Sequence, residues 1–490
     1  MKGDFSRETF DSVKHFSSVL QQQGRVQLDA DWNEQTAILL HYLRTLAADL
    51  MGPFAGPQGS SGFEITRESL KDDFNIGKGR YYVDGILCEN EKPTPYKYQK
   101  DYPILSGKPE AGKDCLVYLD VWERHITALE DDYIREKALG GPDTATRTKV
   151  VWQVKIDDGN GKNDALAWTR DAIHKHWSIW IERWQPRHLG CLMARVDKPE
   201  EDSKDPCLTA PDAKYRGQEN QLYRVEIHHE GILGEATFKW SRDNGAVVSQ
   251  VELSGTELIA EKPRGFAAEI WVELSNDGQE LRGEPGTLVK LLKVEGDRFT
   301  LESSISPLSA IPPGEVWPTK ARRWDQRKSD SLVPKDDGAV ALKEDEWLEL
   351  ENGIQIQFIG KKQGHRYRTG DYWLIPARVA TGKIEWPVKL DSAGEPELDN
   401  ESNVIPIPQP PVGIRHHYAP LAILKTDGTA DDCRCEIPPL NSCKMLSAGE
   451  EGMGGRPLCD TATTQKRISK ASTKSGEADE TAGHRRGKPK

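Results

Sequence analysis

Acidic and amide side chains gather between residues 21 and 35, where Asp29, Asp31 and Asn33 alternate as the first ligands of a calcium loop do. The remainder of such a loop is missing, because Glu34 stands where the loop needs glycine and Leu40 stands where it needs a bidentate glutamate. We therefore interpret this stretch as a polar junction that starts a helix, not as a calcium site.

The cysteines and histidines suggest only weak metal sites. Cys433, Cys435 and Cys443 form the one local cysteine group, but a C-x-C followed eight residues later by a third cysteine is not a standard zinc spacing. The pairs His228-His229 and His416-His417 occupy adjacent positions, which point to opposite faces of a regular strand and so cannot share one metal. We assign no metal, with the three cysteines as weak candidates for zinc or a disulfide.

The sequence also offers few patterns typical of catalytic sites. Glu269 with Glu273, and Asp131 with Asp132, offer paired carboxylates of the kind that acid–base catalysis uses, but such pairs are common on the solvent faces of β proteins. The sequence contains no G-x-S-x-G, no P-loop, no H-E-x-x-H and no G-x-G-x-x-G opening a helix. No catalytic residue and no cofactor is therefore assigned.

The 14 tryptophans are the one compositional excess that hints at recognition. Trp177, Trp180 and Trp184 could form an exposed platform that stacks on sugars, but they recur at helical spacing, which favours a place in the core. Carbohydrate stacking by these three rings stays open as the alternative.

Length and charge limit the partners. A chain of 490 residues holds several domains, and a net charge of −12 argues against coating nucleic acid or an anionic membrane. No run of apolar residues is long enough to span a membrane, and the first seven residues lack the apolar core of a signal peptide, so synthesis in the cytoplasm is expected. The last thirty residues carry eight basic and three acidic side chains with few apolar ones, so a disordered basic tail is expected over 447–490.

Two helices are expected at the N-terminus. Val13, Phe16 and Leu20 share one face of a first helix over 11–20, with Asp11 as its N-cap and Gly24 as its stop. A second helix should begin after Asp31, with Glu34 completing a capping box, and end at Gly52. Its apolar residues recur in steps of three and four and must pack on the body or on a neighbouring subunit's copy. The expected interaction residues are Arg25, Asp29, Asp31, Trp32, Leu39, Leu43, Leu46 and Leu50.

From residue 57 onward the pattern alternates as in β-strands. Turn sequences predict hairpins around Asp84-Gly85, Asp243-Asn244-Gly245, Gly296-Asp297 and Asn352-Gly353. The segment 165–184 is read as a helix. The predicted fold class is mainly β with an N-terminal helical segment, built from several small antiparallel sandwich- or barrel-like modules.

The chain is divided by these patterns into six parts. They are an N-terminal helical attachment segment (1–56), a first β-rich domain (57–230), a second β-rich domain (231–390, with a small barrel or sandwich over 231–306 and a remainder over 307–390), a proline-rich stiff linker or edge (391–412), a short C-terminal β segment (413–446) and the basic tail (447–490).

Six blocks of sequence resemble the signature of a family of functionally uncharacterised bacterial proteins: Lys2–Arg7, Gln22–Gln35, Gly140–Thr144, Glu219–Glu226, Lys239–Gly245 and Tyr367–Pro376. Members of that family are found near phage-tail-like, contractile-injection-type genes, and some continue into a right-handed β-helix. The resemblance runs from Met1 to about Cys443, and the basic tail stands where the β-helix would follow.

The resemblance implies a non-enzymatic structural or adaptor component of a phage-tail-like particle, in a baseplate or fibre position and docked through its N-terminal helical segment. The implied partners are other particle proteins, with a homo-oligomer as a further option, and the protein would be particle-associated or released with the particle. The alternative from a different class is a carbohydrate-binding or carbohydrate-cleaving β-rich protein.

Overall fold

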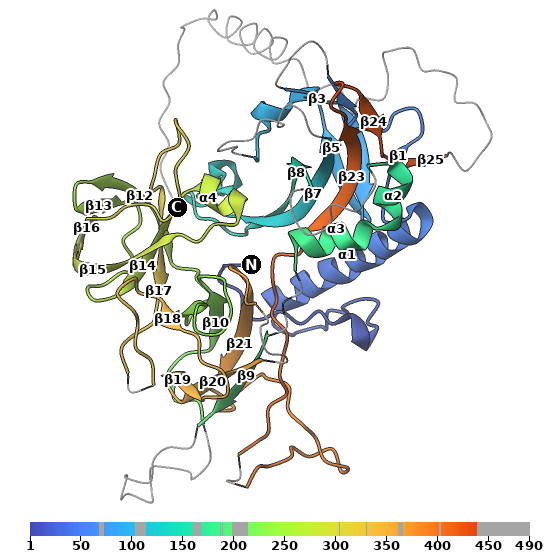
Figure 1. The fold of residues 1–490 in the computed structure, drawn as a ribbon. Coiled ribbons are helices and arrows are strands. Elements are labelled where there is room, and N and C mark those ends of the chain that lie inside the picture. The colour runs from blue at the N-terminus through green and yellow to red at the C-terminus, as the bar shows by residue number, and fades with distance from the viewer. Residues whose placement is uncertain are drawn as a thin grey trace, which may run out of the picture. The chain divides into compact units, whose positions relative to one another are not determined.

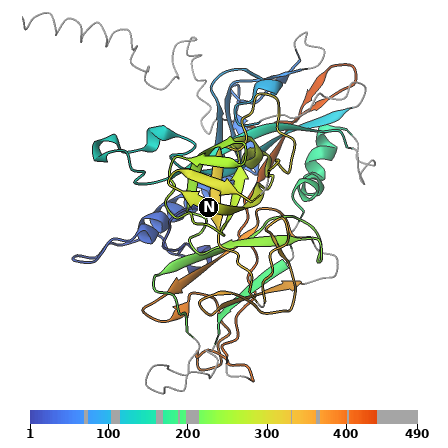
Figure 2. The ribbon, with the colours of Figure 1, turned by 90° about the vertical axis from the view of Figure 1, so that its left-hand side faces the viewer.

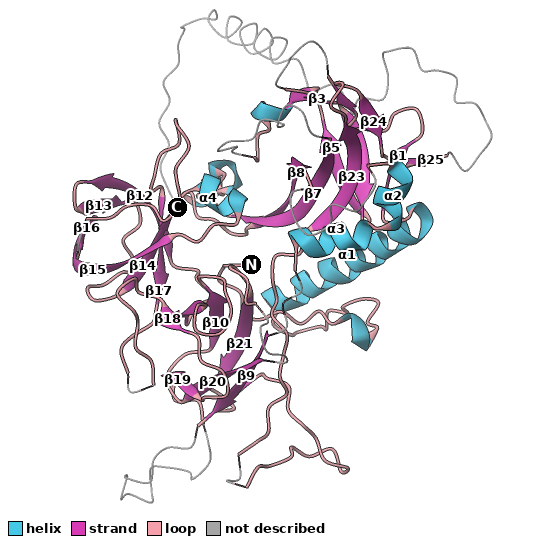
Figure 3. Ribbon diagram, viewed as in Figure 1, coloured by secondary structure: helices cyan, strands magenta, loops and turns pink. Residues whose placement is uncertain are grey.

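Strands are the main regular secondary structure of the described residues, as the sequence predicts (Figure 3). The computed structural model describes residues 1–67, 73–102, 114–159, 168–186, 188, 190–197, 214–302, 304–329, 331–360, 366–400 and 403–438. The basic tail and Cys443 lie outside the described residues. Residues 1–438 form a single unit in which three sets of sheets surround three apolar cores.

The first set of sheets lies beside the long N-terminal helix (Figure 1). One sheet has the order β24-β23-β7-β8, a second has the order β25-β1-β4-β5, and a third has the order β2-β3-β6. The strands span β1 Phe54–Pro57, β2 Ile65–Thr66, β3 Asn75–Ile76, β4 Gly79–Val83, β5 Ile86–Asn90, β6 Thr94–Pro95, β7 Cys115–Ile126, β8 Arg147–Asp157, β23 His417–Leu424, β24 Ala430–Asp432 and β25 Glu436–Ile437. We call this set the first module.

The second module pairs a five-stranded sheet, β18-β11-β10-β21-β22, with a three-stranded sheet, β19-β20-β9, over a shared apolar core. Its strands span β9 Gly190–Val196, β10 Gln221–Ile227, β11 Thr237–Ser241, β18 Val340–Ala341, β19 Leu348–Glu351, β20 Ile354–Gly360, β21 Tyr372–Arg378 and β22 Lys383–Ile384.

A closed six-stranded barrel, β12-β13-β16-β15-β14-β17, forms the third module (Figure 2). Its strands span β12 Val248–Ser254, β13 Glu257–Ala260, β14 Trp271–Ser275, β15 Thr287–Glu295, β16 Arg298–Leu301 and β17 Lys320–Trp324. A small barrel or sandwich was predicted over 231–306. The observed barrel starts later and needs β17, which hydrogen-bonds to both β12 and β14 and closes the sheet.

The described residues contain few helices. They are α1 Asp29–Met51, α2 Arg170–Lys175, α3 Trp177–Trp184 and α4 Asp277–Arg282, with single 3₁₀ turns at η1 Ser12–Lys14, η2 Tyr96–Tyr98, η3 Asp132–Ile134 and η4 Lys137–Leu139. The predicted helix near 165–184 is present as α2 and α3, which meet at His176. No described helix combines the length and the apolar character that crossing a membrane requires.

Three of the four predicted hairpins are confirmed. Asp84 and Gly85 adopt φ angles of 48° and 76° between β4 and β5, and Asn352 and Gly353 adopt 51° and 80° between β19 and β20. Strands β15 and β16 pair around Gly296. The turns at Asp84-Gly85 and Asn352-Gly353 have positive φ at both central residues, a conformation that Asn, Asp and Gly tolerate, whereas in the third turn only Gly296 does, at 60°.

The fourth predicted hairpin, around Asp243-Asn244-Gly245, is wrong. The chain does turn there, but β11 pairs with β10 and β18 whereas β12 pairs with β13 and β17, so the turn joins the second module to the barrel. The buried amide of Asn244 donates to the carbonyl oxygens of Met1 (3.0 Å) and Gly3 (2.9 Å). The N-terminal residues are therefore hydrogen-bonded to this turn.

The modules mix segments that are distant in sequence. The predicted C-terminal β segment supplies β23, which pairs with β7 in the first module. Strand β9, placed by sequence in the first domain, pairs along its whole length with β20 of the second module. The proline-rich stretch 391–412 behaves as an edge and not as a linker, since Gln409 exchanges backbone hydrogen bonds with Leu192 and Val412 does so with Tyr372.

Candidate functional site

The N-terminal 51 residues carry the largest share of exposed apolar side chains. Of the 33 large apolar residues that are exposed in the described part of the chain, 14 lie in this segment. Those in α1 include Trp32 (64% exposed), Leu39 (53%), Leu43 (59%), Leu46 (45%) and Leu50 (70%). This stripe was predicted to pack either on the body or on a neighbouring subunit, and it does not pack on the body.

The opposite face of α1 holds the helix on the first module. Ala30 and Ile38 are buried, and Arg44 makes a two-pronged ion pair with Glu123 of β7, with both N–O distances at 2.8 Å. The β4–β5 turn lies so close that a Cβ on Gly85 would stand 2.2 Å from the carbonyl oxygen of Arg44. Packing on one face therefore fixes which face of α1 points outward.

An extended arm, residues 5–28, runs beside α1 and replaces the first predicted helix. Asp11 does cap the 3₁₀ turn η1 by accepting from the amide of Val13, but the helix stops there. Val13, Phe16 and Leu20 are 76%, 58% and 83% exposed, so no apolar contact sustains further turns in the described structure. Beyond η1, Arg25 lies exposed in the turn at Gly24.

The arm is tied to the start of α1 by two acidic side chains, one of which, Glu34, was predicted to complete a capping box. Asp29 accepts from the amide of Ser6 (2.8 Å) and Glu34 accepts from the hydroxyl of Thr9 (2.6 Å). The predicted capping box between Asp31 and Glu34 is wrong, because α1 starts three residues earlier than predicted and Glu34 is bonded to the arm. Partial burial would raise the pKa of Asp29, but the hydrogen bonds from Ser6 lower it.

A buried charge cluster joins the second module to the barrel. We call it the Lys239 cluster, and it consists of Lys2, Arg224, Glu226, Lys239 and Glu273. Lys239 is 2% exposed and its Nζ lies 2.5 Å from Glu273 Oε1 and 3.3 Å from Glu226 Oε1. Glu226 also pairs with Lys2 (2.9 Å) and Arg224 (2.6 Å).

The carboxylates of the Lys239 cluster are held ionised. Burial alone would raise the pKa of Glu273, but Lys239 and Lys2 outweigh it and lower the pKa to about 2. The same competition sets the pKa of Glu226 well below its usual range, with Lys2, Arg224 and Lys239 as the opposing charges. The indole N–H of Trp324 and the amide of Gly286 complete the coordination of Glu273 at 2.9 and 3.0 Å. These partners satisfy the carboxylate of Glu273 on both oxygens.

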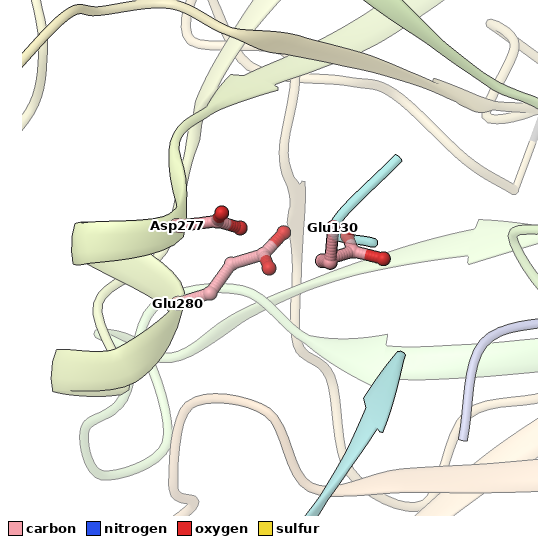
Figure 4. Close-up of side chains that lie close together, drawn as sticks. All are labelled: Glu130, Asp277 and Glu280. Atoms are coloured by element: carbon pink, nitrogen blue, oxygen red, sulfur yellow. The ribbon is translucent and has the colours of Figure 1, made fainter. Parts of the chain in front are cut away.

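A second cluster brings three carboxylates within 4.8 Å of one another (Figure 4). Glu130 comes from the loop after β7, and Asp277 and Glu280 come from α4, so the cluster spans the first module and the barrel. We call it the Lys320 cluster, because Lys320 Nζ of β17 lies 2.5 Å from Glu130, 2.6 Å from Asp277 and 3.0 Å from Glu280. Arg124 binds Asp277 and Glu280 as well, at 2.7 and 2.8 Å.

The Lys320 cluster has the donor set of a cation site with an ammonium group already in contact with all three carboxylates. Burial lowers the pKa of Lys320, but Glu280, Glu130 and Asp277 outweigh this and raise it, so the amine stays charged. The arrangement is an ion-pair clamp between modules. Sequence reasoning missed this cluster because its members come from distant segments. The one local signal is Asn276, an N-cap residue that indicates the start of α4, the helix that carries Asp277 and Glu280.

The tryptophans of α3 lie in the core, as favoured from their spacing. Trp177 and Trp180 are buried, and Trp184 is partly buried with its ring stacked on Tyr118 at 3.7 Å. Their faces are therefore covered by other side chains of the first module.

Two of the three candidate cysteines, Cys433 and Cys435, lie in the described part of the chain. Cys433 is buried, and burial raises the pKa of its thiol to about 12. The sulfur of Cys435 lies 4.0 Å from Nδ1 of His174, a longer contact than a shared zinc ligand set gives.

The other candidate pairs are separated. Glu269 is exposed and paired with Lys290, whereas Glu273 belongs to the Lys239 cluster. The histidines of the second pair bind different acids, His416 with Asp120 and His417 with Asp84, each at 2.7 Å. His228 and His229 follow the end of β10, and their ring centroids lie 4.4 Å apart, so the prediction of divergent strand positions was wrong.

The fold and its clusters define a mainly β protein whose modules are tied by buried ion pairs and whose N-terminal helix presents an apolar face to solvent. A family model matches residues 1–182 and 185–490, and the chain belongs to this family, which is described as a family of unknown function (DUF6519). No curated protein and no solved structure matches the chain.

Proposed function

We propose that this protein is a structural or adaptor component of a phage-tail-like, contractile-injection-type particle, docked through its N-terminal segment. The observation that carries the proposal is the concentration of exposed apolar side chains on α1 and the arm. Large contiguous apolar surfaces are rare on soluble monomers and mark protein interfaces. The resemblance of the sequence blocks to a family found near such particle genes supplies the kind of partner.

The ion pairs between the modules suit a structural component whose shape must stay fixed. The Lys239 and Lys320 clusters cross the boundaries between modules with buried or partly buried ion pairs, and their charged groups are engaged with one another. Such contacts fix the relative placement of the sheets because breaking one partner leaves a charge without compensation. A rigid body with one adhesive segment is what an adaptor needs.

The second function, carbohydrate binding or cleavage, would draw on exposed aromatic faces. Trp177 and Trp180 are buried in the first module, so their rings do not offer the exposed faces that carbohydrate stacking needs.

Co-purification tests the proposal. The full chain, carrying an affinity tag in its producing cells, should capture tail-like particle proteins, and a variant with Leu43→Glu and Leu46→Glu should capture fewer of them. Thr45→Glu, which adds a charge at an exposed position of the same helix, is the matched control and should behave as the unchanged chain. Capture of no particle protein, together with binding or degradation of polysaccharide, would contradict the proposal.

A further inference from the structure

The exposed stripe of α1 follows the spacing of a coiled-coil seam. Residues 32, 36, 39, 43, 46 and 50 alternate in steps of four and three, and all six are exposed. Alternating steps of this kind are the a and d positions of a heptad repeat, whose side chains insert between those of a facing helix. Thr36 is the one polar member. The spacing of the seam therefore fits another helix better than it fits an irregular protein surface.

The facing helix must come from outside this unit. Among the described helices, α1 has 23 residues and the next longest, α3, has eight, so none of the others can follow a seam of three heptads. The body side of α1 is already occupied through Ala30, Ile38 and the Arg44–Glu123 ion pair. Figure 1 shows α1 beside the first module, and the side chains of the seam are exposed in this unit.

The positions that flank the seam point to an identical partner. Coiled coils that select a different partner do so through opposite charges at e and g, next to the seam. Here these positions are occupied by Asn33, Gln35, Leu40, Tyr42, Ala47 and Asp49. Only one of the six is charged, so two identical seams meet with little repulsion and no charge pattern demands a basic or acidic partner.

We propose that the seam of α1 binds α1 of further copies of this chain in a helical bundle. Leu40 (39% exposed) and Tyr42 (68%) widen the apolar stripe beyond a and d, which favours a bundle of three or more helices over a pair. The bodies would then surround a central bundle, and the arm with its exposed Val13, Phe16 and Leu20 would remain free to meet the particle. The inference rests on the proposed structural role, which it deepens by naming the partner of this one surface.

The mass of the purified full chain in solution tests the inference without any particle. Size-exclusion chromatography with light scattering should give a multiple of 54.9 kDa. Leu43→Glu with Leu46→Glu should weaken self-association by about 100-fold or more, because the seam would bury carboxylates without partners. Thr45→Glu should leave the mass unchanged.

Two results would overturn the inference. One is a monomer for the unchanged chain at about 50 µM, a concentration at which an assembly of micromolar affinity would still form. The other is an oligomer that the double variant leaves intact. Circular dichroism and the urea midpoint of the double variant establish that it is folded, which is expected because both leucines are exposed. A monomer that is still incorporated into particles would defeat the inference and leave the proposed function standing. An oligomer found in no particle would do the reverse.

Discussion

Removing the ammonium group of Lys239 should destabilise the protein more than any surface charge change. Lys239→Met keeps the length of the side chain but leaves Glu273 without the cation that lies 2.5 Å from its Oε1. Glu273 would retain two neutral donors, the amide of Gly286 and the indole of Trp324. Breaking one side of a buried ion pair costs about 3 to 5 kcal/mol, and we expect that loss in the free energy of unfolding.

Urea unfolding followed by tryptophan fluorescence measures this loss, with Trp324 as a local reporter whose ring centre lies 4.5 Å from Lys239 Nζ. The matched control is Lys290→Met, which removes the partner of the exposed Glu269 and should cost less than about 1 kcal/mol. The double change Lys239→Met with Glu273→Leu should recover much of the loss, since apolar replacement of both partners removes the uncompensated charge. Equal costs for Lys239→Met and Lys290→Met would refute the reasoning.

Two further predictions concern protons and cations. Because the pKa of Glu273 is lowered from 4.5 to about 2, its contribution of about 3 kcal/mol is fully present above pH 4.5 and is lost as the pH falls toward 2. Urea midpoints at pH 7, 4 and 3 should fall less steeply for Glu273→Gln than for the unchanged chain, and parallel slopes would count against this assignment. At the Lys320 cluster, millimolar Ca²⁺ or Mg²⁺ should not raise the melting temperature of the unchanged chain, because the ammonium group already contacts all three carboxylates. The variant Lys320→Ser should melt at a higher temperature with Ca²⁺ than without it, and a cation-dependent rise in the unchanged chain would contradict the assignment of Lys320.

Local chemistry made much of the fold predictable. The turns at Asp84-Gly85 and Asn352-Gly353 need positive φ angles that few residues adopt, so sequence alone locates them. The continuous apolar run of β7 and the helical spacing of the α3 tryptophans report which side chains are buried. In each case the deciding interaction lies within a few residues.

Pairings between distant segments could not be read in this way. Asn244 looks like an ordinary turn residue, but its amide is used by Met1 and Gly3, more than 240 positions earlier. Strand β23 lies about 300 residues from β7, and nothing in its own sequence names that neighbour. The two charge clusters share this property, because each side chain is unremarkable until the sheets bring it to its partners.

The first predicted helix is an error of a different kind, because the local sequence predicts an element that the structure lacks. Residues 11–20 have a cap and an amphipathic pattern, yet a helix this short is marginal without a surface to pack on. Val13, Phe16 and Leu20 meet no such surface in this unit. The same three residues are the part of the arm that a docking partner would cover.

Whether the protein is present in purified tail-like particles tests the central claim most directly. Mass spectrometry of particles isolated from cells that produce the unchanged chain should find it at a fixed ratio to the other particle proteins, and particles from cells producing Leu43→Glu with Leu46→Glu should contain much less of it. Particles that contain none of the unchanged chain, while the protein is abundant in the same cells, would contradict the account.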